Sequence, residues 1–171
     1  IQGIKGSNHH QVALDYFGDT IGLVECMSFH DLVDQLINKE ADKGIMAIEN
    51  SIAGSIIPNY ALVYENNLHI IGEYYLNIHH HLMALEGQDL SDIFEVRSHP
   101  MALLQCREFL KTQPQIKMIE DVDTAETARN IQKNHLKGVG AIAPRVAADL
   151  YNLKIVKEDI QTIRNNSTRF I

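Results

Sequence analysis

Short hydrophobic runs alternate along this chain with longer stretches in which hydrophobic residues recur every three or four positions. The short runs have the length of buried strands, and the longer stretches have the spacing of amphipathic helices. The runs predict strands over residues 1–4, 21–27, 44–48, 116–119, 138–142 and 153–156, and a long strand-like region over 68–85. The stretches predict helices over residues 7–17, 28–38, 101–110, 123–134 and 144–151, and one that begins near Pro58. Strands that alternate with helices in this way are typical of α/β sheets with parallel pairs.

Helix start and stop residues support several of these boundaries. Ser7, Ser28 and Asp123 stand at the starts of predicted helices, where their side chains can accept hydrogen bonds from free backbone N–H groups. Asp31 follows Ser28 at the spacing of a capping box, and Gly18 stands where the first helix is expected to end.

The composition is that of a globular protein. The 171 residues are 45% hydrophobic and 22% charged, which suits one domain or two small lobes. The formal net charge is −7 without a basic block, so we expect no binding to nucleic acid. The apolar runs are too short to span a membrane, and the chain does not open like a signal peptide. Cys26 and Cys106 lie far apart, which favours two reduced thiols in a cytoplasmic protein.

The closing segment 165–170, Asn-Asn-Ser-Thr-Arg-Phe, is the first candidate site. In a strand, Thr168 and Phe170 would share one face and Arg169 would point to the other. The planar fork of N–H donors on Arg169 suits a carboxylate. A surface turn with a solvated arginine is the alternative, and the local composition by itself favours that alternative.

Two further polar groups follow predicted strands. Residues 49–55, Glu-Asn-Ser-Ile-Ala-Gly-Ser, come directly after the strand that ends at Ile48, and ligands in open α/β sheets bind at such strand ends. A helix cap and turn is an equally good interpretation. In the third group Ser98 could cap a helix on which Gln105 lies two turns further on, and no ordered acid partner supports a nucleophilic triad with His99.

Neither the histidines nor the early glycines form a cofactor motif. Adjacent residues in the triple histidine 79–81 would point to opposite faces of a strand, so we expect no metal site there. The spacing of Gly3 and Gly6 is too short for a dinucleotide or P-loop motif. The turn they form would instead bring the helix that starts at Ser7 close to an anion.

Taken together, these groups resemble the catalytic domain of prephenate dehydratase. The resemblance rests on three segments in order, residues 44–55, 98–106 and 166–170, with an opening loop at 3–11 and a helix start at 123–125, and it covers the whole chain. Four positions depart from the family's usual pattern: Ile4, Lys5, Asn8 and Ala47. These departures bear on fine substrate preference more than on the activity.

The resemblance implies an α/β fold of two lobes, like the type II periplasmic binding proteins, with a ligand cleft between the lobes. Residues 1–73 and 160–171 would form lobe one, and residues 74–159 would form lobe two. The family commonly continues into a regulatory ACT domain. This chain stops one residue past Phe170, so we expect that domain to be absent from it.

The implied activity is a carbon–oxygen lyase of phenylalanine biosynthesis that converts prephenate to phenylpyruvate, with loss of water and carbon dioxide. Aromatisation would drive the reaction, so the resemblance implies neither a metal nor a redox cofactor, and it implies a homodimer. Thr168 would be the catalytic hydroxyl, assisted by Glu49, which burial could keep protonated, and by Gln105. The expected substrate-binding residues are Arg169, Asn50, Ser51, Ser98, Thr124, Ser7 and Phe170. Helix N-termini near Ser7, Ser98 and Asp123 would supply further anion contacts.

Two other functions stay open at this point. Arogenate, which carries an amine in place of the pyruvyl ketone, could be the substrate. The chain could also be a non-catalytic ligand-binding module of the same fold, although such a module would have no use for the hydroxyl of Thr168.

Overall fold

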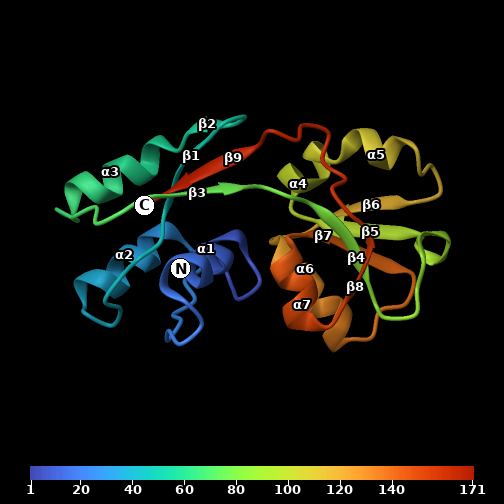
Figure 1. Ribbon diagram of the computed structural model, residues 1–171, viewed down its shortest axis with the longest axis horizontal. Helices are drawn as coiled ribbons and strands as arrows, with labels where there is room; N and C mark the ends of the chain where they lie inside the picture. The colour runs from blue at the N-terminus through green and yellow to red at the C-terminus, as the bar shows by residue number, and fades with distance from the viewer. The chain divides into compact units, whose positions relative to one another are not determined.

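The computed structural model describes residues 1–171 and divides them into two compact units (Figure 1). Unit 1 consists of Ile1–Ile4, Asn8–Ile78 and Asn165–Ile171, and unit 2 of Lys5–Ser7 and His79–Arg164. Each unit has its own β-sheet with helices packed against it. The expected α/β class is therefore confirmed.

Unit 1 is built on a four-stranded sheet in which every strand pair is antiparallel. The strands lie in the order β2 (Gly54–Ser55), β1 (Ala47–Asn50), β9 (Ser167–Phe170) and β3 (Tyr74–Asn77). The helices are α1 (Asn8–Phe17), α2 (Phe29–Ile37) and α3 (Ile57–Glu65). Ile45 and Ala47 pack in a hydrophobic cluster with α1, whereas Met46 and Ile48 pack with α2 and α3. Consecutive residues before and within β1 thus serve two separate cores, as expected of an extended chain.

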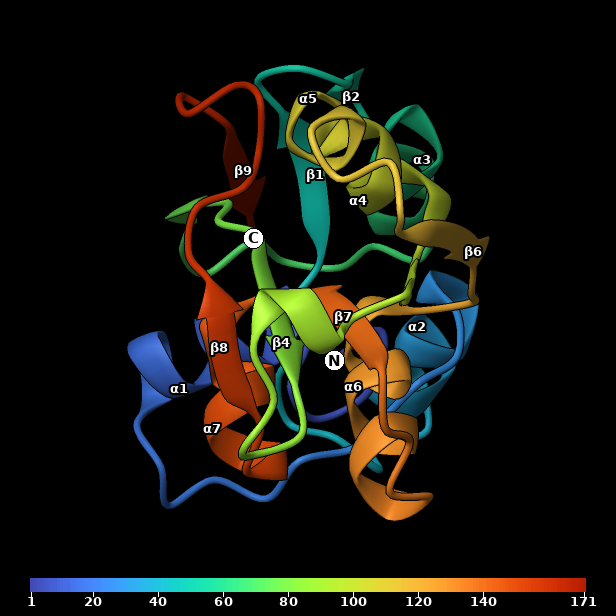
Figure 2. The ribbon, with the colours of Figure 1, turned by 90° about the vertical axis from the view of Figure 1, so that its right-hand side faces the viewer.

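Unit 2 has a five-stranded mixed sheet, of which β8, β4 and β7 lie side by side in Figure 2. The strand order is β6 (Lys117–Glu120), β5 (Glu95–Ser98), β7 (Val139–Ala143), β4 (His81–Ala84) and β8 (Lys154–Lys157). The pairs β5–β6 and β5–β7 are parallel, and β4 is antiparallel to both of its neighbours. The helical segments are η1 (Leu90–Asp92), α4 (Pro100–Gln105), α5 (Arg107–Lys111), α6 (Thr124–Lys133) and α7 (Arg145–Tyr151).

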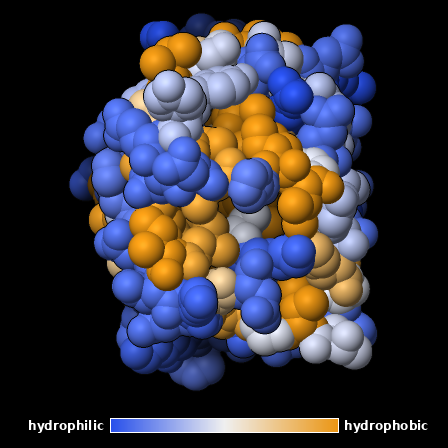
Figure 3. Space-filling view, turned by 90° about the vertical axis from the view of Figure 1, so that its left-hand side faces the viewer, coloured by the Kyte–Doolittle hydropathy of each residue, from blue (hydrophilic) through white to orange (hydrophobic).

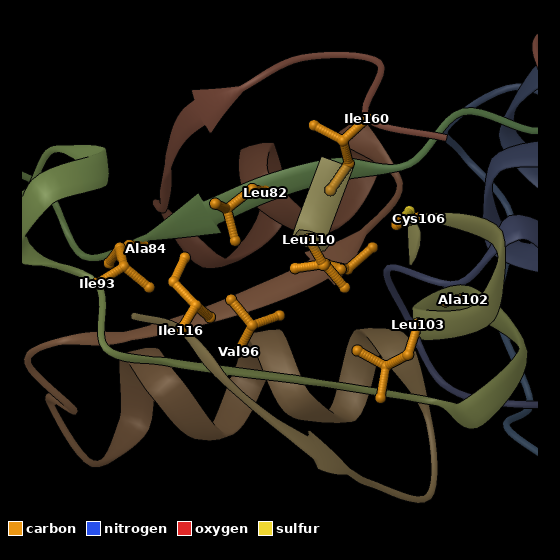
Figure 4. Packing of buried hydrophobic residues seen from close by; sticks show 11 residues of the cluster. Leu82, Ala84, Ile93, Val96, Ala102, Leu103, Cys106, Leu110, Ile116 and Ile160 are labelled. Carbon is orange, nitrogen blue, oxygen red and sulfur yellow. The ribbon is translucent and has the colours of Figure 1, made fainter. Parts of the chain in front are cut away.

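Helices cover both faces of the unit 2 sheet, with α4 and α5 on one side and α6 and α7 on the other (Figure 1). Leu82 of β4 packs in the first of these cores, which Figure 4 shows together with Cys106 and Ile160. Its neighbour Met83 packs in the second core, against α6 and α7. This alternation explains why all four residues of β4 are buried.

Three of the local cap signals are confirmed. Ser28 and Asp31 form the expected capping box at the start of α2, and Asp123 caps α6 by accepting from two backbone N–H groups. Gly18 follows α1 with a φ of +83°, a conformation that glycine adopts without steric cost. Such caps are predictable because they depend only on residues a few positions apart.

Four predicted elements are wrong. Residues 1–4 and 21–27 form no strands but only isolated bridges, in which Cys26 pairs with Gln2 and Gly3. The region 68–85 is not one strand but contributes β3 to unit 1 and β4 to unit 2. The expected helix 101–110 is interrupted at Cys106, whose ψ of 10° ends α4 before α5 begins. Parallel pairs of strands, moreover, occur only in unit 2.

The division of the chain by contacts differs by a few residues from the expected lobes 1–73 plus 160–171 and 74–159. β3 belongs to unit 1 because Tyr74–Asn77 pairs along β9. Ile160 belongs to unit 2 because its side chain packs in the core of Figure 4. The assignment of functional lobes, with a ligand cleft between them, stays a prediction.

Both cysteines are buried free thiols. Burial raises the pKa of Cys106 to about 12. None of the helices has the length and hydrophobicity needed to cross a bilayer.

Candidate functional site

The predicted site residues fall into two groups, one in each unit. The unit 1 group comprises Glu49, Asn50, Ser51, Thr168, Arg169 and Phe170. The unit 2 group comprises Ser7, Ser98, Gln105 and Thr124.

A register shift in β1 determines which members of the first group meet. Ala47 pairs with Phe170, but Glu49 pairs with Arg169 and Asn50 with Thr168, so β1 has one more residue than β9 over this stretch. Such a bulge reverses the faces on which the following side chains lie. Asn50 therefore lies on the face of Thr168, and Glu49 lies on the face of Arg169.

Asn50 holds the hydroxyl of Thr168. The Oδ1 atom of Asn50 accepts hydrogen bonds from the backbone N–H groups of Ile52 and Ala53 at 3.0 and 2.9 Å. This orientation directs Nδ2 of Asn50 at Oγ1 of Thr168, 2.9 Å away. Because Nδ2 can only donate, Thr168 accepts from it, and the hydroxyl proton of Thr168 remains available for a ligand. Thr168 is 8% exposed, so the hydroxyl is held in a largely dry setting.

Asn166 is a member of this cluster that the predicted site did not include. Its Oδ1 accepts a 2.6 Å hydrogen bond from Nδ2 of Asn50, and its backbone carbonyl accepts from the N–H of Ile78. Asn166 is almost completely buried. The only available signal was its place in the closing motif, since burial and contact with Asn50 depend on the sheet.

Ser51 ties the loop after β1 to the start of β9. Its Oγ accepts a 2.9 Å hydrogen bond from the N–H of Ser167 and lies 3.4 Å from the carbonyl oxygen of Asn165. Its own N–H donates to the carbonyl of Ser167. Ser51 thereby supports the strand that carries Thr168, and its role as a substrate ligand stays a prediction.

Arg169 and Glu49 lie on the other face of the sheet. Nε and Nη2 of Arg169 donate to the same oxygen of Glu73 at 2.8 and 2.7 Å, and the guanidinium lies 5.9 Å from the ring centre of Tyr75. Glu49 is 4.0 Å from Arg169. Its side chain is 47% exposed, so it lacks the burial on which a protonated carboxyl was expected to depend. Neither residue reaches the hydroxyl of Thr168 from this face.

Phe170 packs in the core, as expected from its position beside Thr168. It is 2% exposed, and its ring makes an edge contact with His9 at 5.0 Å between ring centres. Its packing supports the strand that carries Thr168, and its role as a substrate-binding residue stays a prediction.

In unit 2, the parallel strands β5, β6 and β7 end at a common edge of the sheet, and the helices α4, α6 and α7 begin there. Ser98, the last residue of β5, is 0% exposed and donates to the carbonyl of Ile142 at 2.6 Å. It does not cap α4, because Nδ1 of His99 accepts from the N–H of Met101 instead. Burial thus gives Ser98 a contact within the sheet.

We expected free backbone N–H groups at the starts of α4 and α6 to bind an anion. This expectation is wrong for three of them. The N–H of Met101 donates to His99, and those of Ala125 and Glu126 donate to Asp123. At α6, the carboxylate of Asp123 accepts from the N–H groups of Ala125 and Glu126 at 2.8 and 2.9 Å. A negative charge already at that position opposes a second anion. Thr124, the first residue of α6, is partly exposed beside this cap.

The opening loop packs against α6 and α7. Gly6 has a φ of +94°, and a side chain there would lie 3.0 Å from the ring of Tyr151 and 3.3 Å from Ala125. The hydroxyl of Tyr151 donates to the carbonyl of Lys5. These contacts place Gly6 next to the first turn of α6, and Ser7, the following residue, is buried.

Gln105 contacts a histidine that was not among the predicted site residues. Its Oε1 lies 2.7 Å from Nε2 of His80. His79 and His81 stack with 6.3 Å between ring centres, so the triple histidine does alternate in direction as expected. His79 is exposed, whereas His80 and His81 are buried. No group of three His, Cys, Asp or Glu side chains is arranged for a metal ion.

Hydrophobic side chains gather on one face of unit 1, where Figure 3 shows them around hollows in the surface. Two hollows of about 270 and 350 Å³ share Val63, Leu68 and Ile70 in their walls. None of the predicted site residues lines either hollow. The polar cluster around Thr168, and not the larger apolar hollows, therefore has the groups that chemistry on a small acid needs.

Comparison with known proteins identifies the family. The family model for prephenate dehydratase matches residues 1–171. An arogenate dehydratase/prephenate dehydratase 2 of Arabidopsis thaliana, described as chloroplastic, is 36% identical over 170 residues, which are 99% of this chain and 44% of that protein.

Solved structures agree on the fold. A prephenate dehydratase of Arthrobacter aurescens in complex with L-Phe has a TM-score of 0.88 at 23% identity, and the match covers 100% of this chain and 59% of that one. GqqA, described as a novel type of quorum-quenching acylase, has a TM-score of 0.87 at 27% identity, with coverage of 99% and 60%. The chain thus spans less than two thirds of each of these proteins. By its sequence and its fold it belongs to the prephenate dehydratase family.

Proposed function

We propose that the protein is a dehydratase that converts prephenate to phenylpyruvate, water and carbon dioxide in phenylalanine biosynthesis. The observation that carries the proposal is the hydrogen bond from Nδ2 of Asn50 to Oγ1 of Thr168. It gives the closing motif a hydroxyl whose proton can be donated, in a mostly buried position.

The reaction requires one bond to break at each end of the prephenate ring. The carbon–carbon bond to the ring carboxylate breaks and releases carbon dioxide, and its electron pair enters the ring. The carbon–oxygen bond at the opposite ring position breaks, and the oxygen leaves as water after it gains a proton. A donor held at that oxygen stabilises the negative charge that develops on it. We assign this task to Thr168, with Asn50 fixing the direction in which its proton points.

Arogenate is the second candidate substrate, because the Arabidopsis relative is named for both acids. The two substrates differ only in the side chain, which carries an amine in place of a ketone, and the leaving hydroxyl is the same. The Thr168 cluster would serve both. The choice between them depends on the groups that contact the side chain.

An acylase activity, the description given to GqqA, is less consistent with the cluster. An acyl-transfer hydroxyl needs a neighbouring base that accepts its proton. The only partner of the Thr168 hydroxyl is the Nδ2 group of Asn50, which donates. A non-catalytic ligand-binding module remains the third alternative, and it would make no use of this donor.

The deciding experiment is an assay of the purified chain with prephenate and with arogenate at equal concentrations. Phenylpyruvate from prephenate is followed by absorbance, and phenylalanine from arogenate by chromatography. Turnover of prephenate supports the proposal, and turnover of arogenate alone supports the second candidate. If neither acid is converted while one of them binds, the protein is a binding module. Hydrolysis of an acylated amine without either dehydration would point to an acylase.

We further propose that the enzyme is a cytoplasmic homodimer that needs no metal or redox cofactor. Two buried free thiols are consistent with a reducing compartment, and aromatisation supplies the driving force without electron transfer. Light scattering of the purified protein tests the dimer. Activity that survives prolonged dialysis against a chelator tests the independence from metal.

A further inference from the structure

The hydrogen bond between His80 and Gln105 points to a role for a histidine outside the predicted site. We infer that His80 is a positioning residue that orients the side-chain amide of Gln105 for the reaction. This inference rests on the proposed dehydratase function and on the catalytic role that the resemblance to the family implies for Gln105. His80 itself would touch neither the substrate nor the reacting atoms.

The chemistry of the contact determines the direction of the hydrogen bond. Oε1 of Gln105 is an amide oxygen and can only accept, so Nε2 of His80, 2.7 Å away, must carry the proton. The amide oxygen of Gln105 is thereby occupied, and its NH₂ group is directed away from His80. His80 thus selects one of the two orientations that a glutamine amide can adopt, and presents Gln105 as a donor.

The other ring nitrogen supports this tautomer. Nδ1 of His80 is buried and has no hydrogen-bond partner. If Nδ1 carried the proton, an N–H group would be buried without an acceptor, which is costly. Burial also lowers the pKa of His80, so the ring is neutral at neutral pH and carries a single proton. The single proton therefore lies on Nε2, the ring nitrogen that faces the acceptor Oε1 of Gln105.

One segment of the chain holds the backbones of both residues. The N–H of Ile160 donates to the carbonyl of His80, and Oε1 of Gln161 accepts from the N–H of His80. The N–H of Thr162 donates to the carbonyl of Gln105. The stretch 160–162 therefore fixes the distance between the two residues. Ile160 of this stretch also packs in the hydrophobic cluster of Figure 4, together with Leu82 and Cys106.

A buried imidazole with one hydrogen bond and one unpaired nitrogen is costly for a structural role alone, since an apolar residue would pack in a core at lower cost. His80 is 5% exposed, whereas Gln105 is partly exposed at the end of α4. The histidine therefore connects the rigid interior to a polar group at the surface of the unit. That arrangement is typical of residues that support a functional side chain from behind.

The test compares two replacements that differ in where they offer a donor. In His80→Gln, the amide Nε2 can take the place of the ring Nε2 and still reach Gln105. In His80→Asn, the amide corresponds to the ring Nδ1 and does not reach. We expect His80→Asn to lower kcat about tenfold with less than a twofold change in KM, and His80→Gln to stay within about threefold of the wild type.

A double-mutant cycle with Gln105→Met isolates the path of the effect. If His80 acts through Gln105, His80→Asn should change kcat less than twofold in the Gln105→Met background. An equal loss in both backgrounds would overturn the inference, as would an unchanged kcat in His80→Asn or a loss in His80→Gln as large as in His80→Asn. Melting temperatures show whether each variant is folded.

A second readout does not depend on activity. Nitrogen-15 NMR of histidine-labelled wild-type protein should show His80 as the neutral tautomer with the proton on Nε2. A proton on Nδ1 would overturn the inference even if the variants are unstable. Absence of turnover of both acids by the wild type would instead overturn the proposed function, and the two failures are thus distinct.

Discussion

The amide of Asn50 donates to the hydroxyl of Thr168 over 2.9 Å, although 118 positions separate them in the chain. Two backbone N–H groups hold the oxygen of the same amide, so its nitrogen faces the segment that carries Asn166 and Thr168. This contact makes Asn50 the residue on which the direction of the Thr168 proton depends.

Asn50→Asp should lower kcat about 100-fold, because a carboxylate at this position would accept the Thr168 proton that the leaving oxygen needs. Steady-state kinetics with prephenate provide the measurement. Asn77→Asp is a matched control, since it adds the same charge to an exposed position of β3 in the same sheet. Similar losses in the two variants would mean that charge alone, and not the contact with Thr168, is responsible.

Thr168→Val should lower kcat by roughly 10² to 10³ while the melting temperature stays within a few degrees, because it removes the hydroxyl but keeps the shape of the side chain. Thr168→Ser keeps the hydroxyl and should retain kcat within about tenfold. Unchanged turnover in the valine variant would remove Thr168 from the mechanism.

Arg169→Lys should raise KM several-fold with little change in kcat if the guanidinium binds a substrate carboxylate, because a point charge replaces a two-pronged donor. Glu73→Gln breaks the same surface ion pair but keeps the guanidinium. It should leave KM unchanged or lower it. If both variants raise KM equally, the ion pair matters and direct substrate binding by Arg169 is contradicted.

Ser98→Ala should destabilise the fold by about 1–3 kcal/mol, because the buried carbonyl of Ile142 loses the hydroxyl that donates to it. Urea unfolding provides the measurement. A rise in KM without loss of stability would show instead that Ser98 binds the substrate and that its hydrogen bond to Ile142 does not stabilise the fold.

His9 should make stability fall in mild acid. Burial lowers its pKa from 6.5 to about 3, so the folded state binds its proton more weakly than the unfolded chain does. The stability that depends on neutral His9 is complete above pH 6.5 and is lost progressively between pH 6.5 and 3. Between pH 7.5 and 5.5 the loss should be roughly 1.4 kcal/mol.

Urea unfolding of His9→Gln at the two pH values tests this contribution, because the variant cannot titrate there. Its stability should change less between pH 7.5 and 5.5 than that of the wild type, by roughly the amount that linkage assigns to one histidine. His30→Gln, at an exposed position of α2, should leave the pH dependence as it is. Equal pH dependence in wild type and His9→Gln would exclude His9 as the source.

Much of the local structure was predictable because it depends on neighbours in the chain. The capping box of Ser28 and Asp31 and the cap at Asp123 were identified from spacing alone. The alternation of Thr168, Arg169 and Phe170 followed from the geometry of any strand. Sequence thus determined the α/β class, most helix boundaries and which closing residues share a face.

The tertiary structure decided which candidates meet. Simple alternation from Ala47 would put Asn50 on the face opposite Phe170 and Thr168, and the bulge in β1 reverses that assignment. Residues 21–27 have the hydrophobicity of a strand, but a strand needs a partner, and here only Cys26 finds one.

The burial of His80 was equally beyond the sequence. A triple histidine looks polar and exposed, and only the packing of three distant segments encloses its middle residue beside Gln105. The sequence by itself determined the chemical groups of this protein and their local conformations. The long-range register of the strands decided which group donates to which, because hydrogen bonds depend on distance in space and not along the chain.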